Sequence, residues 1–162
     1  MLIGIDPLLS GELLAILRDM GHGDTIALCD SNFPATFLGP PAIRIDTDVL
    51  AAGRAVLSVM PLDGFVDTPI MRMEGPGGAR ELMDVHKEFH AMAGEVAGDW
   101  QMGGFERFRF YEEARGCVAT VATLERRGYA NFILTKGVID AEGKVRRHVR
   151  PATPPKGAPR RR

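Results

Sequence analysis

The sequence contains little cysteine. Its 162 residues include two, Cys29 and Cys117, which lie far apart and lack the spacing of metal ligands. Small domains that depend on disulfides are much denser in cysteine, so this composition argues against a disulfide scaffold. We expect both residues to be buried free thiols, because unpaired cysteine behaves as a small apolar side chain.

Long apolar runs are also absent. No stretch approaches the roughly 20 apolar residues that a membrane-spanning helix needs. The chain is 45% hydrophobic and 25% charged, as ordinary globular domains are. Residues 1–7 do not show the basic segment and apolar stretch of a secretory signal. We therefore expect a cytoplasmic protein of one domain with no membrane partner.

Acidic residues are missing from the C-terminal end. Eight of the 20 lysines and arginines occur from Lys144 onward, where there is no aspartate or glutamate. Residues 1–143 therefore carry 12 basic and 21 acidic groups, a formal charge of −9. An acidic body argues against nucleic acid as a partner. We predict a folded domain over residues 1–150 and a disordered basic tail over residues 151–162, which have no apolar pattern.

Helical and extended patterns alternate along the rest of the chain. Helices are predicted over residues 10–20, with Ser10 as the N-cap, and over residues 48–60, 80–92 and 107–115. Strands are predicted over residues 25–29, 43–46, 69–74, 118–124 and 132–134. This order predicts a single α/β domain around a mostly parallel sheet flanked by helices.

One candidate site surrounds His22, which lies between Gly21 and Gly23 just after the first predicted helix. Asp30 ends the strand that follows, and ligands of α/β folds favour such strand ends. Histidine changes charge near neutral pH and therefore suits proton transfer. The Gly-His-Gly triplet is a weak motif, and spacing alone favours a turn or capping histidine without a catalytic role.

Two further segments offer polar side chains. Tyr129 and Asn131 precede the last predicted strand, and their hydroxyl and amide groups suit the hydroxyls of a sugar. In residues 105–111 arginines, Arg107 among them, alternate with aromatic residues, as in the wall of a site. Considered separately, each segment is explained better without a functional role: the first as an ordinary turn, and the second as a core segment with solvated charges.

His86 and His90 are candidate metal ligands, because residues four apart share a helix face. The first histidine is followed by Lys87 rather than by the glutamate of a zinc protease helix, and no third ligand is obvious. A polar helix face explains the pair better, so we predict no metal. Residues 75–78, Gly-Pro-Gly-Gly, lack the lysine and hydroxyl residue of a phosphate loop and indicate a turn.

Together the motifs resemble a known family. Residues 2–35 contain Leu-Ile-Gly-Ile-Asp-Pro-Leu-Leu-Ser, Met-Gly-His-Gly-Asp and Cys-Asp-Ser-Asn-Phe-Pro-Ala, and residues 129–131 and 134–138 read Tyr-Ala-Asn and Leu-Thr-Lys-Gly-Val. Over residues 1–139 the chain resembles the fucose mutarotase / ribose pyranase family, and L-fucose mutarotases most closely. The resemblance implies an α/β fold that assembles into rings, commonly homodecamers, with sites near subunit boundaries and no metal or organic cofactor.

The resemblance also implies which residues act. His22 matches the catalytic histidine of the family, and the sugar-binding positions are Asp30, Arg107, Tyr129, Ala130 and Asn131. Ribose pyranases typically carry histidine where this chain has Arg107, which favours the fucose type. Two departures are Leu124, where a small residue usually precedes the glutamate, and a longer C-terminal segment.

We therefore expect an isomerase that interconverts the α and β anomers of L-fucose. His22 is the expected acid and base, and Asp30 orients either the imidazole or a sugar hydroxyl. The alternatives are a D-ribose pyranase and a monosaccharide-binding module without catalytic activity.

Overall fold

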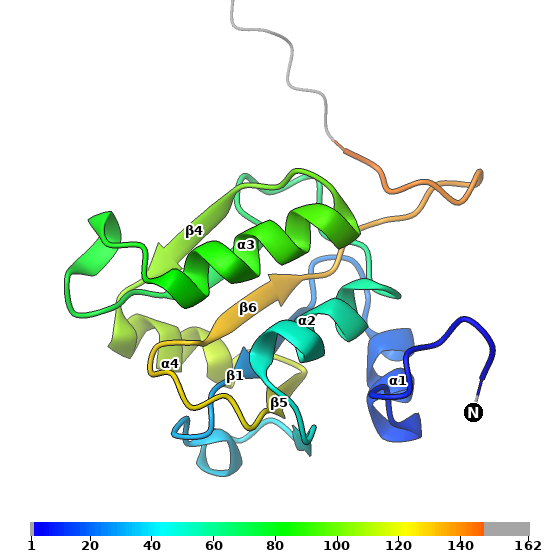
Figure 1. The fold of residues 1–162 in the computed structure, drawn as a ribbon. Coiled ribbons are helices and arrows are strands. Elements are labelled where there is room, and N and C mark those ends of the chain that lie inside the picture. The colour runs from blue at the N-terminus through cyan, green and yellow to red at the C-terminus, as the bar shows by residue number, and fades with distance from the viewer. Residues whose placement is uncertain (1, 148–162) are drawn as a thin grey trace, which may run out of the picture.

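One six-stranded sheet forms the centre of the protein. The computed structural model describes residues 2–147, and its strand order is β2-β5-β1-β6-β3-β4 (Figure 1). The strands are β1 Thr25–Cys29, β2 Ala42–Arg44, β3 Ile70–Met73, β4 Met102–Phe105, β5 Ala119–Ala122 and β6 Phe132–Thr135.

The sheet is mixed, so the prediction of a mostly parallel sheet is confirmed only in part. The β1–β5, β2–β5 and β3–β4 pairs are parallel, whereas β6 runs antiparallel to both of its neighbours, β1 and β3. Residues 123–131 connect β5 to β6 without a helix. The chain therefore reverses direction at the edge of the sheet formed by the carboxyl ends of β1 and β5, and β6 starts from that same edge.

Helices cover both faces of the sheet. The α-helices are α1 Gly11–Asp19, α2 Val49–Leu57, α3 Asp84–Ala97 and α4 Arg107–Arg115, and two short 3₁₀ turns are η1 Ala35–Phe37 and η2 Gly78–Arg80. In β1, Ile26 and Leu28 pack with α1, α2 and α3, while Ala27 and Cys29 pack with α4 and η1. Alternation along the strands thus divides the core into two layers.

Side-chain caps set the start of three helices. Ser10 accepts a hydrogen bond from the Leu13 amide at 3.2 Å, which confirms its predicted role. Asp48 accepts from the amides of Leu50 and Ala51, and Glu106 caps α4 in the same way. The cap at Glu106 places Arg107 in the first turn of α4.

Strand β4 was not predicted, and α3 was predicted about four residues early. The β4 segment, Met-Gly-Gly-Phe, lacks the β-branched residues that mark strands. The glycines lie close to neighbouring side chains: a Cβ at Gly103 would lie 2.6 Å from the Met71 sulfur, so a larger residue there would require the Met71 side chain to shift. Helix α3 begins only after the 3₁₀ turn η2 and ends at Gly98, whose φ of +89° favours glycine.

Residues beyond β6 fold back onto the domain. Ile139 pairs with Val145, and Arg147 pairs with Gly64. The Arg147 guanidinium lies 3.8 Å from the centre of the Trp100 ring and donates to the Asp99 carbonyl at 2.7 Å. The domain limit predicted at residue 150 and the basic tail predicted over residues 151–162 lie outside the described residues.

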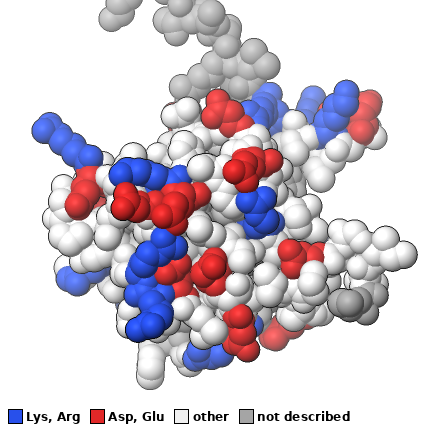
Figure 2. Space-filling view, viewed as in Figure 1, with Lys and Arg blue, Asp and Glu red and all other residues white. Residues whose placement is uncertain are grey.

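The surface is of mixed charge where Figure 2 shows it. Acidic and basic side chains are interspersed over the face that carries α2 and α3. Within residues 2–147, no helix is both long and apolar enough to cross a bilayer.

The two thiols are expected to be unreactive in the native protein. Cys29 is fully buried and Cys117 nearly so, and burial raises the pKa of Cys117 to about 11 and that of Cys29 well above its ordinary value. About one Cys117 thiol in a thousand is then ionised at pH 8, and only the thiolate is nucleophilic. We expect slow alkylation by iodoacetamide in buffer and rapid alkylation of both thiols in urea. Rapid native alkylation would contradict this burial.

Candidate functional site

Four of the predicted sugar-binding side chains meet at one edge of the sheet. Asp30 directly follows β1, and Asn131 directly precedes β6, which runs in the opposite direction. Arg107 begins α4 just after β4, and Tyr129 lies in the connection between β5 and β6. All four line a pocket of about 150 Å³. The mixed sheet therefore assembles a site from segments up to about a hundred residues apart.

Asp30 and Asn131 form a buried, reciprocal pair. The Asp30 amide donates to Asn131 Oδ1 at 2.9 Å, and Asn131 Nδ2 donates to Asp30 Oδ2 at 2.9 Å. Burial raises the pKa of Asp30, and hydrogen bonds from Asn32, Asn131, Phe33 and Ala130 partly oppose that rise. The pair gives the pocket a fixed carboxyl group that is surrounded by donors.

The turn at Tyr129 has an unusual backbone. Tyr129 has a φ of +62°, the one positive value among the non-glycine residues from 2 to 147. The next residue, Ala130, is fully buried, and its backbone lies close enough to the Asp30 carboxyl group to lower the pKa of that group. Ala130 therefore contributes main chain to the site, whereas Tyr129 contributes a side chain to the pocket wall.

Helix α4 supplies a second tyrosine, Tyr111, which the sequence prediction placed in a possible site wall but not among the sugar-binding residues. Arg107 and Tyr111 are one helical turn apart and both line the pocket. The Tyr111 ring lies 5.4 Å from that of Phe33, which also lines it. Part of the segment in which arginines alternate with aromatic residues, residues 105–111, therefore forms a wall of the pocket. Tyr111 could have been predicted to line the pocket from its spacing of four residues from Arg107 on the same helix.

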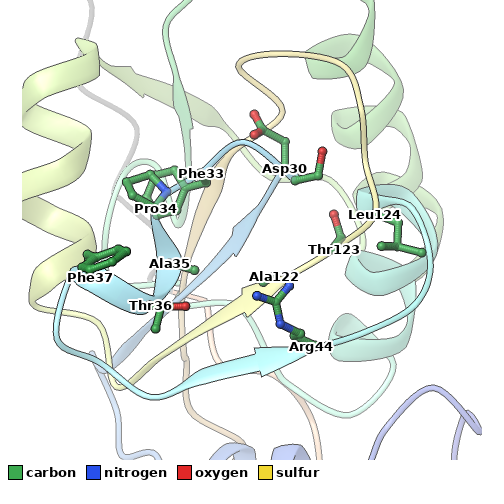
Figure 3. Close-up of a pocket in the computed structure, with 11 residues that line it drawn as sticks. Asp30, Phe33, Pro34, Ala35, Thr36, Phe37, Arg44, Ala122, Thr123 and Leu124 are labelled. Carbon is green, nitrogen blue, oxygen red and sulfur yellow. The ribbon is translucent and has the colours of Figure 1, made fainter.

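Further hollows adjoin the pocket. One of about 210 Å³ shares Asp30 and Phe33 with it and extends past the hydroxyls of Thr36 and Thr123 to Arg44 (Figure 3). Another, of about 260 Å³, shares Arg107 and Tyr129. Carboxyl, amide, phenol, hydroxyl and guanidinium groups thus converge beside aromatic faces, a set suited to a polyhydroxylated ligand.

His22 lies at the opposite edge of the sheet. It precedes β1, whereas Asp30 follows it, and the strand spans about 16 Å between Thr25 and Asp30 at roughly 3.3 Å per residue. The His22 side chain is 48% exposed. One copy of the chain therefore does not bring His22 into the pocket. Of the two roles predicted for Asp30, orienting the imidazole of its own chain is wrong.

The carboxylate beside His22 is Asp63, which the sequence prediction missed. His22 Nε2 lies 3.1 Å from Asp63 Oδ1, and the same oxygen accepts from the Phe65 amide at 2.9 Å. Asp63 is nearly fully buried, and its amide donates to the Thr135 carbonyl at the end of β6. Nothing in the spacing of residues 22 and 63 indicates this contact, because the fold alone brings the two segments together.

This geometry defines which imidazole nitrogen can exchange protons. An ionised carboxylate only accepts hydrogen bonds, so a neutral His22 carries its proton on Nε2 and points it at Asp63. Nδ1 is then the basic nitrogen. The Phe65 ring, 5.3 Å from the imidazole, covers part of one side. A half-exposed histidine fixed by a buried carboxylate is suited to act as a general acid and base.

The interpretation of His86 and His90 as part of a polar helix face is wrong for His86. His86 is fully buried and its Nε2 lies 3.0 Å from the Tyr129 carbonyl, while His90 Nε2 lies 2.6 Å from the Trp100 carbonyl. Each imidazole is thus engaged with main chain. In the part of the chain that the structure describes, no three His, Cys, Asp or Glu side chains gather in a way that could hold a metal ion.

The raised pKa of Asp30 predicts a pH dependence of stability. Asp30 stays protonated to a higher pH in the native protein than in the unfolded chain. Asp30 therefore stabilises the native state at a pH below its ordinary pKa, and this contribution is lost as pH rises through the raised pKa. We expect the unfolding free energy of Asp30→Asn, relative to the wild type, to increase as pH rises from about 4. Urea denaturation across the acid range measures this trend.

Glu125→Gln is the matched control with the opposite sign. A bidentate hydrogen bond from Arg127 lowers the pKa of Glu125, so its contribution is present above the ordinary pKa and lost as pH falls through the lowered one. The stability of this variant relative to the wild type therefore decreases as pH rises. Parallel trends for the two variants would contradict the assigned environments.

Known proteins resemble this chain over most of its length. A family model for the RbsD / FucU transport protein family matches residues 3–139. Fucose mutarotase of Mus musculus is 39% identical over 144 residues, which cover 85% of this chain and 94% of the mouse protein. L-fucose mutarotase of Glaesserella parasuis is 37% identical over 140 residues, which cover 85% of this chain and 96% of that protein.

Solved structures share the fold. The fucose mutarotase of Streptococcus pneumoniae, in complex with L-fucose, matches with a TM-score of 0.79 and 34% identity, over 86% of this chain and all of that one. Bacillus subtilis RbsD, complexed with D-ribose, has the same fold with a TM-score of 0.65 and 18% identity, over 83% of this chain and 98% of that one. The resemblance seen in the sequence is confirmed, and the chain belongs to the RbsD / FucU transport protein family.

Proposed function

We propose that the protein is a mutarotase that interconverts the α and β anomers of L-fucose. The observation that carries this proposal is the pocket in which Asp30, Arg107, Tyr129 and Asn131 converge. The sequence resemblance implies that these residues occupy sugar-binding positions. In support, relatives named fucose mutarotase match the chain at 37–40% identity. The activity is that of an isomerase acting on a carbohydrate.

Each pocket residue has a role that its chemistry supports. The Asp30 carboxyl group and the Asn131 amide bind sugar hydroxyls through fixed acceptors and donors, held by their mutual hydrogen bonds. The Arg107 guanidinium donates to further hydroxyls, and the rings of Tyr129 and Tyr111 pack against the carbon face of the sugar. Since Asp30 is held by Asn131 and lies far from the His22 of its own chain, we assign it to a sugar hydroxyl.

Anomer exchange requires one proton to leave and one to arrive. A base removes the proton of the anomeric hydroxyl, an acid protonates the ring oxygen, and the bond from C1 to the ring oxygen breaks. The open aldehyde rotates about the C1–C2 bond, and the reverse transfers close the ring on the other carbonyl face. His22 is the group we assign to these transfers, with Asp63 holding its Nε2 and leaving Nδ1 to exchange protons.

The separation of His22 from the pocket requires a second copy of the chain. We propose that His22 of one subunit completes the pocket of a neighbour in a ring-shaped homo-oligomer, with a decamer as the expected size. Large exposed apolar side chains lie near His22 and near the pocket, the two half-sites. Phe65 lies beside His22, Phe37 and Leu124 line the hollow that adjoins the pocket, and the Phe108 ring lies under the Arg107 guanidinium. Burial of such side chains between copies would stabilise the assembly.

We also propose that the protein acts in the cytoplasm.

A sugar-binding module without catalytic activity is the second candidate. The distance between His22 and the pocket favours this candidate, because a pocket that receives no His22 from a neighbouring subunit would bind sugar without the histidine assigned to proton transfer. A D-ribose pyranase is the third. Arg107, in the position where ribose pyranases typically carry histidine, argues for the fucose type.

The activity is tested by exchange NMR on the anomeric protons of L-fucose. The wild-type protein is expected to accelerate α/β exchange, and His22→Asn to lower that acceleration at least about 100-fold, as expected for loss of a general acid and base. L-fucose binding and the unfolding midpoint of the variant should stay near those of the wild type. Acceleration of D-ribose ring exchange alone would indicate a pyranase. Binding without acceleration of either sugar would indicate the binding module.

Sharing of the site between copies is tested by mixing two inactive variants. His22→Asn leaves the pocket intact, and Arg107→Ala leaves His22 intact. When the two variants are denatured and refolded together, an intact pocket meets a neighbour's intact His22 in about a quarter of the sites if the subunits mix at random, and in about half if they alternate. We expect the mixture to regain a substantial part of the wild-type exchange rate, while each variant refolded alone stays inactive. A mixture as inactive as its parents would place the acid and base within one chain.

A further inference from the structure

The buried His86 is tied to the sugar pocket through the main chain. Its Nδ1 accepts a hydrogen bond from the Met83 amide at 3.3 Å, and its Nε2 lies 3.0 Å from the Tyr129 carbonyl oxygen. A nitrogen that accepts from an amide carries no proton, so the proton of the neutral ring is on Nε2 and is donated to Tyr129. The two contacts therefore assign one tautomer and leave neither ring nitrogen unpaired.

The acceptor belongs to the strained residue of the site. Tyr129 holds a left-handed φ of +62°, which costs free energy for any residue with a Cβ and persists only when surrounding contacts hold it. Of the two residues that follow, Asn131 exchanges two hydrogen bonds with Asp30, and the backbone of Ala130 lies close enough to the Asp30 carboxyl group to lower its pKa. The turn is thus held by Asp30 on the pocket side and by His86 on the core side.

The imidazole itself is held rigidly. It is fully buried and meets the Phe132 ring edge to face at 6.0 Å, and Phe132 is stacked on Phe89 of the same helix at 3.8 Å. Burial lowers the pKa of His86, an effect that the nearby Arg72 of β3 increases and that the Tyr129 carbonyl and Glu81 oppose. A neutral ring with a single tautomer is a stable donor over the physiological pH range.

We propose that His86 is a positioning residue of the sugar pocket, whose Nε2–H holds the Tyr129 carbonyl and so fixes the turn that presents Tyr129, Ala130 and Asn131 to the substrate. The inference rests on the proposed function for its catalytic readout. The competing account is a purely structural histidine, which caps the first turn of α3 through Met83 and affects only the stability of the fold.

Three variants separate these accounts. His86→Leu keeps an apolar side chain but removes both hydrogen bonds. His86→Gln keeps an acceptor and a donor, and glutamine is a favoured residue at this position of a helix start. Met92→Ala is the matched control, since Met92 is a buried residue of α3 that faces Gly53 of α2, away from the turn. It should destabilise the fold without changing the pocket.

Kinetics of L-fucose exchange at increasing sugar concentration give the first readout. We expect His86→Leu to raise KM about tenfold, the effect of losing one well-formed hydrogen bond to the binding turn, with kcat changed much less. His86→Gln should restore most of the affinity, and Met92→Ala should keep the wild-type KM while lowering the unfolding midpoint. A wild-type KM in His86→Leu, or an equal rise in Met92→Ala, would overturn the proposal.

Amide hydrogen exchange gives a second readout that needs no sugar. Exchange at Ala130 and Asn131 should speed up in His86→Leu beyond the change seen at core amides, and it should follow the core amides in Met92→Ala. Uniform acceleration in both variants would reduce His86 to a structural role. If the wild-type protein does not accelerate anomer exchange, the proposed function fails, and this measurement still decides whether His86 holds the turn.

Discussion

The site depends on the paired hydrogen bonds between Asp30 and Asn131. Two residues that are 101 positions apart exchange a main-chain and a side-chain hydrogen bond where β1 ends and β6 begins. Both side chains are buried, so removal of one partner would leave a buried polar group of the other without this hydrogen bond. The pairing ties the β5–β6 connection to β1, and with it the positions of Tyr129 and Ala130. The contact from α3 through His86 holds the same turn from the other side.

The direction of β6 explains why the residues proposed for sugar binding lie apart from the histidine proposed for proton transfer. Strands β1 and β3 are both antiparallel to β6, so they end at the sheet edge where β6 starts, and the proposed binding residues gather there. The other edge holds the segments before β1 and after β6, and these position His22 and Asp63. A single copy has two half-sites separated by the length of a strand. Catalysis in the proposed form therefore depends on assembly, and the exposed aromatic residues beside both half-sites fit that requirement.

Local signals predicted much of this structure from sequence. The short apolar run in residues 25–29 and the serine before the first helix led to correct elements, because local apolar patterns and capping residues are encoded in neighbouring positions. Strand β4 could not be found in this way, since its Met-Gly-Gly-Phe segment lacks strand-forming residues and is extended through its pairing with β3. Asp63 and the burial of His86 were missed for a similar reason. Both depend on contacts between segments more than 40 residues apart, which spacing along the chain does not encode.

The central claim is that the sugar site is divided between two copies of the chain. A structure of the assembled protein with bound L-fucose tests it most directly. The account predicts L-fucose in the pocket of Asp30, Arg107, Tyr129 and Asn131, with Nδ1 of a neighbouring subunit's His22 within hydrogen-bonding distance of the anomeric hydroxyl or the ring oxygen, directly or through one water. L-fucose bound in that pocket with every His22 far from the anomeric carbon would contradict the account.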